Sequence, residues 1–221
     1  MAWTEQLQST NWVEASRIAI GAYLLGCCTT GYYLVRWRTG QDIRDSGSGS
    51  VGARNVSRVL GTPGFVLTVL GDFTRGAVVV WAAEQFTTDT RLIGLALLAV
   101  VAGHIWPAQL CFRGGKGMAT SLGALCVFDP HLTLSFAILF GIGVLLVRKT
   151  IVPGLLAFAC LPFISALLGY NPGGPAYNAP KIFSISLLTT MVLIAHRKNL
   201  NEELIHFLDR RNLGPKQTPP E

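Results

Sequence analysis

Leu92 begins the stretch LIGLALLAVVAGHIWPAQLC, which ends at Cys111 and contains no Asp, Glu, Lys or Arg. An apolar run of about 20 residues is long enough for a helix to cross the hydrocarbon core of a bilayer. The whole chain has the same character, because 50% of its 221 residues are hydrophobic, 14% are charged and the mean hydropathy is +0.44. Average soluble domains carry about 25% charged residues. The sequence therefore predicts an integral membrane protein.

Similar apolar runs recur along the chain. They lie at residues 14–35, 64–83, 92–111, 118–128, 132–147, 151–168 and 182–195. These runs predict an all-α integral membrane protein with about seven transmembrane helices, several of them short. The run 118–128 covers only about half of the hydrocarbon core at about 1.5 Å per residue, so we expect a short or re-entrant helix there.

Basic residues are distributed unevenly between the two sides that seven spans would define. Of the 18 Lys and Arg residues, fourteen fall in the segments 36–58, 112–117, 148–150 and 196–221. The opposite side holds three, Arg17, Arg91 and Lys181, and Arg75 lies within a span. Cytosolic loops of membrane proteins are enriched in Lys and Arg. We therefore expect the N-terminus outside the cell and the C-terminus in the cytosol.

A single transmembrane domain is expected over residues 1–213. No basic segment or cleavage pattern marks a removable leader, so the run 14–35 is interpreted as an uncleaved anchor helix. Residues 214–221, GPKQTPPE, are polar and Pro-rich, which is typical of a disordered tail. The five cysteines lie in or beside apolar runs without a C-x-x-C pair, so neither a disulfide framework nor a zinc site is expected.

Two glycine-rich basic stretches interrupt the apolar pattern: SGSGSVGARNVSR at residues 46–58 and FRGGKGMAT at residues 112–120. Glycine lets main-chain N–H groups approach a ligand closely, and Arg, Lys, Ser and Asn add side-chain donors. Both stretches fall on the predicted cytosolic side. We therefore expect a membrane protein that binds phosphate groups.

Nucleotide and nucleic-acid interpretations fail on context. Gly47, Gly49 and Gly52 match G-x-G-x-x-G, but no strand precedes them and Asp72 lies near the start of an apolar helix instead of ending a second strand. A Walker motif would need glycine at position 110 and Ser or Thr at position 117, where this chain has Leu110 and Gly117. The net charge of +6 is explained by membrane topology, so no nucleic-acid partner is expected.

Three segments together resemble a known family. Residues 47–61 are GSGSVGARNVSRVLG, residues 103–120 are GHIWPAQLCFRGGKGMAT, and residues 196–199 are HRKN. In this order they resemble the bacterial acyl-phosphate:glycerol-3-phosphate acyltransferases, integral membrane enzymes of the first step of phospholipid synthesis. The patterns of that family run approximately G-S-G-N-x-G-A-T-N-V-x-R-x-L-G, G-H-x-x-P-x-x-L-x-F-x-G-G-K-G-x-A-T and H-R-x-N. The resemblance covers about residues 21 to 200.

The resemblance implies seven helices, a bacterial cytoplasmic (inner) membrane location and an active site facing the cytosol. It implies glycerol 3-phosphate and acyl phosphate as substrates, the lipid bilayer as surroundings, and no cofactor or metal. Catalytic roles are expected for Ser48, Lys116, His196 and Asn199. Substrate-binding roles are expected for Gly47, Gly49, Ser50, Gly52, Arg54, Asn55, Arg58, Asp72, Arg75, His104, Gly114, Gly115, Gly117 and Thr120.

The residue chemistry is consistent with these roles. An acyl phosphate carries an activated carbonyl and a good leaving group, so positioning and charge stabilisation can supply much of the rate. Two neighbouring phosphates repel each other and need fixed cations, for which Arg58 and Lys116 are candidates. His196 is a candidate general base or phosphate donor. Asp72 is placed to orient Arg75 or to accept a substrate hydroxyl.

Two alternatives stay open. Ser50 stands where the family pattern has asparagine and Arg54 where it has threonine, as a divergent, non-catalytic relative would show. The other alternative is a phosphate or organic-anion transporter. A transporter is expected to place ionisable groups near the bilayer midplane, whereas Asp72 and Arg75 lie near one end of their span. The sequence leaves the oligomeric state open, a monomer included.

Overall fold

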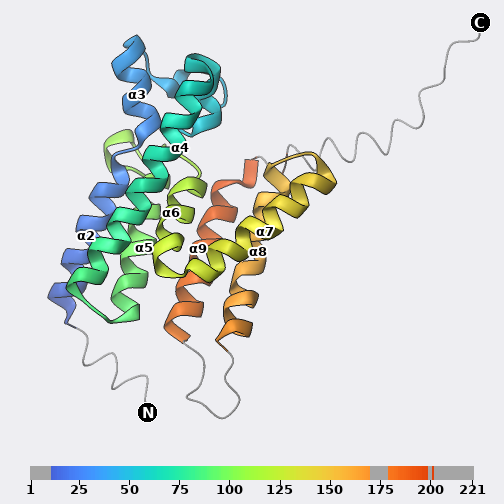
Figure 1. Ribbon diagram of the computed structural model, residues 1–221. Coiled ribbons are helices and arrows are strands. Elements are labelled where there is room, and N and C mark those ends of the chain that lie inside the picture. Colours follow the sequence, from blue (N-terminus) through green and yellow to red (C-terminus); the bar gives the residue numbers. More distant parts are fainter. Residues whose placement is uncertain (1–10, 170–178, 199–200, 202–221) are drawn as a thin grey trace, which may run out of the picture.

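The computed structural model describes residues 11–169, 179–198 and 201, and this part of the chain is helical without strands (Figure 1). The helices are α2 (Trp12–Cys27), α3 (Thr30–Thr39), α4 (Ala53–Phe86), α5 (Thr90–Ile105), α6 (Met118–Phe128), α7 (Pro130–Val147), α8 (Ile151–Leu168) and α9 (Ala179–Ala195), with short 3₁₀ helices η1 (Ile43–Asp45) and η2 (Ala108–Leu110). The predicted tail 214–221 lies outside the described residues.

The predicted all-helical membrane architecture is confirmed. Five segments are long and apolar enough to cross a membrane: Trp12–Thr39, Ala53–Phe86, Thr90–Leu110, Pro130–Val147 and Ile151–Leu168. Two shorter apolar helices, Met118–Phe128 and Ala179–Ala195, complete the set. The short helix expected at 118–128 is therefore present with the expected bounds. The orientation of the protein in the membrane stays a prediction.

The first apolar run differs from the continuous helix expected over 14–35. The helix is interrupted between Cys27 and Thr30, because Thr29 is extended (φ −63°, ψ 115°). The side chain of Gln109 donates a hydrogen bond to the carbonyl oxygen of Cys27, which the interruption leaves without a helical partner. The local sequence CCTTG is poor in strong helix formers.

Helix α4 begins eleven residues before the predicted run at 64–83, at Ala53. Gly61 (φ 65°, ψ −162°) breaks its regular geometry, and Pro63 follows inside the helix. The segment from α3 to Leu60, here called the head (residues 30–60), therefore joins the rest of the bundle through two helix interruptions. Figure 1 shows the head at one end of the bundle.

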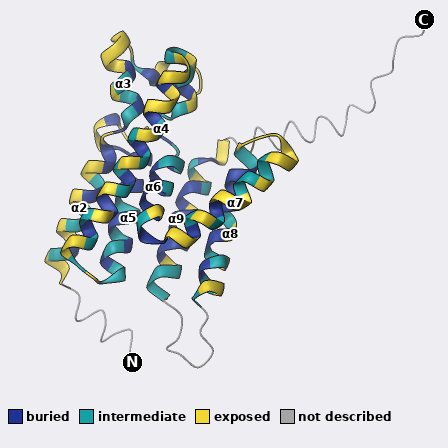
Figure 2. Ribbon diagram, in the orientation of Figure 1, coloured by how far each residue is buried: buried dark blue, intermediate teal, exposed yellow. Residues whose placement is uncertain are grey.

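Two apolar cores hold the molecule together. The larger core draws residues from α2 and from α4 to α9, and includes Leu97, Leu125 and Phe158. The smaller core underlies the head and consists of Val35, Ile43, Val51, Val56 and Leu110. Figure 2 shows buried residues between the helices and exposed residues on the outer faces. Many of the exposed residues are large and apolar, such as Leu145, Leu146 and Phe163, as expected for helices that face lipid.

Glycines let the central helices pack backbone to backbone. A Cβ atom on Gly76 of α4 would overlap the carbonyl oxygen of Thr120 on α6. Likewise, a Cβ atom on Gly26 of α2 would overlap the carbonyl oxygen of Val100 on α5. Small residues at such crossings are typical of membrane helices. This close packing fixes α6, whose N-terminus contributes to the site described below.

Candidate functional site

The first glycine-rich stretch forms a loop that is held by one buried amide, the side chain of Asn55, which is 1% exposed. The Asn55 Nδ2 group donates hydrogen bonds to the carbonyl oxygens of Ile43 (3.1 Å), Ser46 (2.8 Å) and Ser50 (2.9 Å). The Asn55 Oδ1 atom accepts one from the main-chain N–H of Ser48 (2.9 Å). The amide thus holds the loop together, and the substrate contact expected for Asn55 from the sequence stays a prediction.

Glycines permit the tight course of this loop. Gly47 (φ 57°) and Gly49 (φ 68°) adopt left-handed conformations that favour glycine. A Cβ atom on Gly47 would overlap the Asn55 Oδ1 atom and would lie 2.8 Å from Arg58 Nη1. Arg58 Nη1 donates to Asn55 Oδ1 at 3.4 Å. Arg58 therefore lies beside the loop and contacts the side-chain amide of Asn55 that holds it.

The second glycine-rich stretch folds over the end of α5. The N–H of Gly114 donates to the carbonyl oxygen of Ile105 (3.1 Å), and the N–H of Gly115 donates to that of His104 (3.0 Å). A Cβ atom on Gly115 would overlap His104 Nε2, so only glycine fits there. Gly117 (φ 78°) then turns the chain into α6. This course brings Lys116 to the N-terminus of α6, an end of a helix that favours anions.

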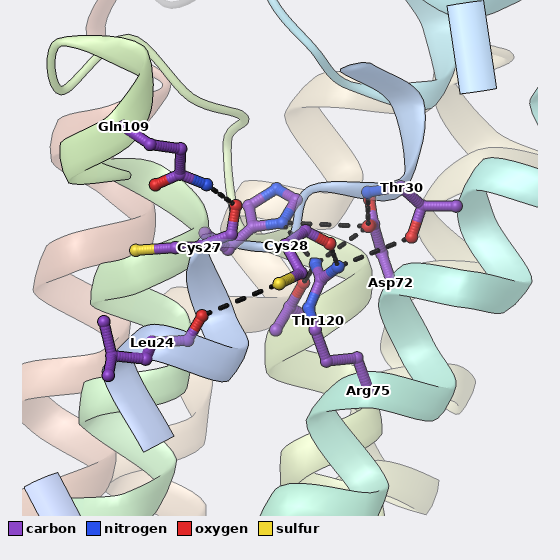
Figure 3. Close-up of polar contacts among 9 residues, drawn as sticks. Leu24, Cys27, Cys28, Thr30, Asp72, Arg75, Gln109 and Thr120 are labelled. Carbon is purple, nitrogen blue, oxygen red and sulfur yellow. Dashed lines mark hydrogen bonds and ion pairs between the residues drawn. The ribbon is translucent and has the colours of Figure 1, made fainter. Parts of the chain in front are cut away.

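Arg75 lies in a buried network at the interruption between α2 and α3 (Figure 3). Its guanidinium donates to Asp72 Oδ1 at 2.8 Å, to the carbonyl oxygen of Cys28 and to Thr30 Oγ1 at 3.4 Å. Asp72 Oδ1 also accepts the main-chain N–H of Thr30 at 3.2 Å. Main-chain polar groups at membrane depth need partners. Asp72 and Arg75 supply them here, a role that the sequence did not predict, and they lie well inside the span Ala53–Phe86 instead of near one end of it as expected.

The guanidinium of Arg75 also determines which ring nitrogen of His104 carries the proton. Arg75 Nη2 lies 2.8 Å from His104 Nδ1 and 3.5 Å from Thr120 Oγ1. A guanidinium only donates hydrogen bonds, so Nδ1 accepts and the proton of the neutral imidazole is on Nε2. His104 therefore offers an N–H group beneath Gly115.

His196, which follows α9, is buried with 5% of its surface exposed. Its Nδ1 atom lies 2.8 Å from the carbonyl oxygen of Val192. A carbonyl oxygen only accepts, so the neutral ring carries its proton on Nδ1 and leaves Nε2 as an acceptor. Burial lowers the pKa of His196 below its ordinary value, the Val192 hydrogen bond opposes that shift, and the charges of Lys116 and Arg54 lower the pKa further. His196 is therefore neutral at pH 7.

A cavity of about 510 Å³ brings these segments together. The site residues predicted from the sequence that line it are Ser48, Ser50, Gly52, Arg54, Asn55, Asp72, His104, Lys116, Gly117 and His196. Its apolar lining comes mainly from Phe65, Val69, Phe73, Met118, Leu122, Phe140 and Ile151. The cavity thus combines cationic and hydrogen-bonding groups with walls that suit a hydrocarbon chain.

Other predicted site residues do not line this cavity: Gly47, Gly49, Arg58, Arg75, Gly114, Gly115 and Thr120. They shape the two loops or support residues that do line it. Asn199 lies outside the described residues. Thr150, in the turn before α8, was not predicted, and its hydroxyl accepts a hydrogen bond from Arg54 Nη2. The one signal for Thr150 was its place in a short basic loop on the predicted cytosolic side.

Comparisons with known proteins agree on one family. The model of the family "Glycerol-3-phosphate acyltransferase" matches residues 17–205. Glycerol-3-phosphate acyltransferase 1 of Desulfitobacterium hafniense (strain Y51) is 42% identical over 193 residues, which cover 87% of this chain and 92% of the relative. Glycerol-3-phosphate acyltransferase of Clostridioides difficile (strain 630) is 37% identical over 205 residues, or 90% and 96% of the two chains.

The fold is likewise similar to a solved structure. The crystal structure of PlsY, an integral membrane glycerol 3-phosphate acyltransferase in its glycerol 3-phosphate form, superposes with a TM-score of 0.77 at 30% identity. The match covers 87% of this chain and 92% of that one. The lysophosphatidic acid form of PlsY superposes with a TM-score of 0.73.

Proposed function

Because this chain belongs to the glycerol-3-phosphate acyltransferase family, we propose that it transfers an acyl group from acyl phosphate to the 1-hydroxyl of glycerol 3-phosphate. The products are lysophosphatidate and inorganic phosphate. The observation that carries this proposal is the cavity, in which cationic and hydrogen-bonding groups adjoin an apolar wall. Such a cavity suits one small soluble anion and one lipid-like anion together.

The phosphate groups are assigned to the end formed by the two glycine-rich loops. Lys116 and Arg54 place two cations there, and Ser48 adds a hydroxyl. Cations, hydroxyl groups and main-chain N–H groups are the usual ligands of phosphate. The acyl chain is assigned to the wall formed by residues such as Phe73, Leu122 and Phe140, because burial of hydrocarbon against apolar side chains is favourable.

The proposed reaction is a direct displacement. The 1-hydroxyl oxygen of glycerol 3-phosphate attacks the carbonyl carbon of the acyl phosphate, a new ester C–O bond forms, and the bond to the leaving phosphate breaks. His196 Nε2, which is an unprotonated acceptor in the neutral ring, accepts the hydroxyl proton. Lys116 stabilises the negative charge that develops on the carbonyl oxygen and the leaving phosphate. Asn199 keeps its expected catalytic role as part of this proposal.

The polar contacts of Asp72 and Arg75 fit a transporter less well than an enzyme. Asp72 and Arg75 are the ionisable pair within a span on which a transport pathway would rely, and they bind each other and the interruption between α2 and α3. Their commitment to the fold favours an enzyme. A non-catalytic relative remains the alternative that an activity measurement must address, because Ser50 and Arg54 both line the cavity.

We also propose that the protein lies in the bacterial cytoplasmic membrane with the cavity open to the cytosol, as the distribution of Lys and Arg favours. The exposed positions Asp45 and Arg113 allow a test. Single cysteines at these positions, with the exposed native cysteines replaced by alanine, should react with an impermeant thiol reagent only after the inner face is made accessible. Labelling from the outer face alone would contradict this orientation.

The decisive experiment is transfer of acyl groups to radiolabelled glycerol 3-phosphate by the purified protein in detergent. Acyl phosphate and acyl-CoA are supplied in parallel, and Lys116→Ala serves as the control. We expect lysophosphatidate from acyl phosphate alone and loss of this product in Lys116→Ala. No product from either donor, with protein shown to be folded by its thermal transition, would contradict the proposal. Product from acyl-CoA alone would contradict the donor.

A further inference from the structure

We propose that Met118 and Phe140 select the length of the acyl chain and that Gly154, which lies outside the cavity lining, sets the position of both side chains. This inference rests on the proposed function, because it concerns the acyl half of that reaction. It assigns a specificity-determining role to three residues of α6, α7 and α8.

Met118 stands at the start of the path that the acyl chain must take. It is the first residue of α6 and follows the phosphate-binding segment at Lys116 by two positions. In an acyl phosphate, the carbonyl carbon is bonded directly to a phosphate oxygen. A donor whose phosphate lies at Lys116 therefore begins its hydrocarbon chain near the backbone of Met118, and the end of the Met118 side chain, which lies with Phe140 next to Gly154, is reached farther along the chain. Both Met118 and Phe140 line the cavity.

Gly154 forms the floor beneath these two side chains. A Cβ atom built on Gly154 would lie 3.2 Å from Met118 Cε, 3.5 Å from Met118 Sδ and 3.7 Å from Phe140 Cε2. Gly154 is itself buried on α8 and does not line the cavity. The absent side chain thus leaves the space in which the end of Met118 rests.

The close packing of α7 and α8 leaves little room for these helices to move apart. A Cβ atom on Gly143 of α7 would lie 2.7 Å from Pro153 Cβ, so α7 and α8 are already in close contact beside Gly154. The ring of Phe140 stacks on Phe136, with centroids 5.7 Å apart and planes 11° apart. Close-packed interiors transmit added volume to their neighbours. A larger side chain at position 154 is therefore expected to move Met118 and Phe140 toward the cavity.

A narrower cavity distinguishes long chains from short ones. A short acyl chain occupies the part near Lys116, whereas a long chain also needs the space past Met118 and Phe140. Each methylene that loses its apolar contacts lowers the relative specificity constant by about fourfold. Exclusion of two methylenes therefore changes the ratio between a long and a short donor by roughly tenfold or more.

The test compares kcat/KM for octanoyl, dodecanoyl and palmitoyl phosphate in one detergent, with the full-length enzyme and a set of variants. Gly154→Leu should lower the palmitoyl-to-octanoyl ratio by roughly tenfold or more while octanoyl transfer persists. Phe140→Ala should shift the ratio toward the longer donor. Gly141→Leu is the matched control, because a Cβ atom on Gly141 of α7 meets no atom within 4 Å, and its ratio should equal that of the wild type.

The outcomes separate this inference from the proposed function. No transfer from any acyl phosphate by the folded wild type would overturn the proposed function. Wild-type transfer with unchanged chain-length ratios in Gly154→Ala, Gly154→Leu and Phe140→Ala would overturn the inference alone. If Gly154→Leu fails to fold, the inference is tested by Gly154→Ala, which should shift the preference toward shorter donors, and by Phe140→Ala, which should shift it toward longer ones. A shift in Gly141→Leu equal to that in the Gly154 variants would also overturn the inference.

Discussion

The side-chain oxygen of Asn55 accepts a hydrogen bond from the main-chain N–H of Ser48 at 2.9 Å, across the first glycine-rich loop. The same amide donates to three carbonyl oxygens of that loop or its approach. Ser48 is therefore positioned through Asn55, and a change at Asn55 should act on substrate binding through the loop that it holds.

Asn55→Asp should raise the KM for glycerol 3-phosphate and acyl phosphate by roughly tenfold or more. The carboxylate cannot donate to the carbonyl oxygens, and each buried polar group left without a partner costs about 1–3 kcal/mol, where 1.4 kcal/mol corresponds to about tenfold. Steady-state kinetics would measure the change. Ser57→Ala, on the same turn of α4, removes only a hydrogen bond to the Arg54 carbonyl and should leave the KM near the wild-type value. Equal kinetics in both variants would contradict the role given to Asn55.

Arg75→Lys should destabilise the protein more than the same substitution of a surface arginine does. The guanidinium binds Asp72, His104 and the Cys28 carbonyl at once, and an ammonium group cannot reproduce that planar fork. The ammonium can still pair with Asp72, but it cannot reach all three acceptors, and each buried acceptor left without a donor costs about 1–3 kcal/mol.

The thermal transition in detergent would measure this loss. The matched control is Arg91→Lys, because the pair of Arg91 with Asp89 is about one-third exposed and such pairs contribute about 1 kcal/mol or less. A similar lowering of Tm in both variants would contradict a structural role for Arg75 at the helix interruption.

Much of this site was predictable from the apolar runs and from the order of the sequence motifs. Apolar runs indicated the helices, and the loop motifs predicted that Ser48, Lys116 and His196 share one site, which the cavity now contains. The structural role of Arg75 was not predictable. The spacing of Asp72 and Arg75 makes them neighbours on α4, but nothing local indicates that the gap between α2 and α3 lies opposite them. Thr150 was missed for the same reason, because its contact with Arg54 depends on how α8 packs.

The neutral His196 gives a pH dependence with a definite sign. Its pKa in the folded protein lies below 6.5, the ordinary value, mainly because the ring is buried. Between 6.5 and the lowered pKa, the unfolded chain binds a proton that the folded protein does not. The contribution of His196 to the free energy of unfolding is therefore fully present above about pH 6.5. It is lost as the pH falls toward the lowered pKa of the folded protein.

Transfer activity should decline over the same acidic range, because only the neutral ring can accept a proton at Nε2. Profiles of Tm and of kcat/KM against pH would measure both effects. His196→Gln should remove the contribution of His196 to the slope of Tm and should lower kcat. His131→Gln, at an exposed position, should change neither profile. A wild-type rate that rises on acidification would contradict a base role for His196.

Arg54 is the residue whose change most directly tests whether this chain's departures from the family pattern are functional. Its guanidinium lines the cavity, donates to Thr150 and lowers the pKa of His196. If it contributes a cation for the phosphates, Arg54→Thr should raise the KM for acyl phosphate by about fivefold, the effect expected of an exposed charge worth about 1 kcal/mol. The increase should shrink at high salt. Arg113→Thr, an exposed change outside the cavity, should leave that KM unaltered.

A large gain of activity in Arg54→Thr, alone or with Ser50→Asn, would instead identify the native loop as impaired and would favour the divergent relative.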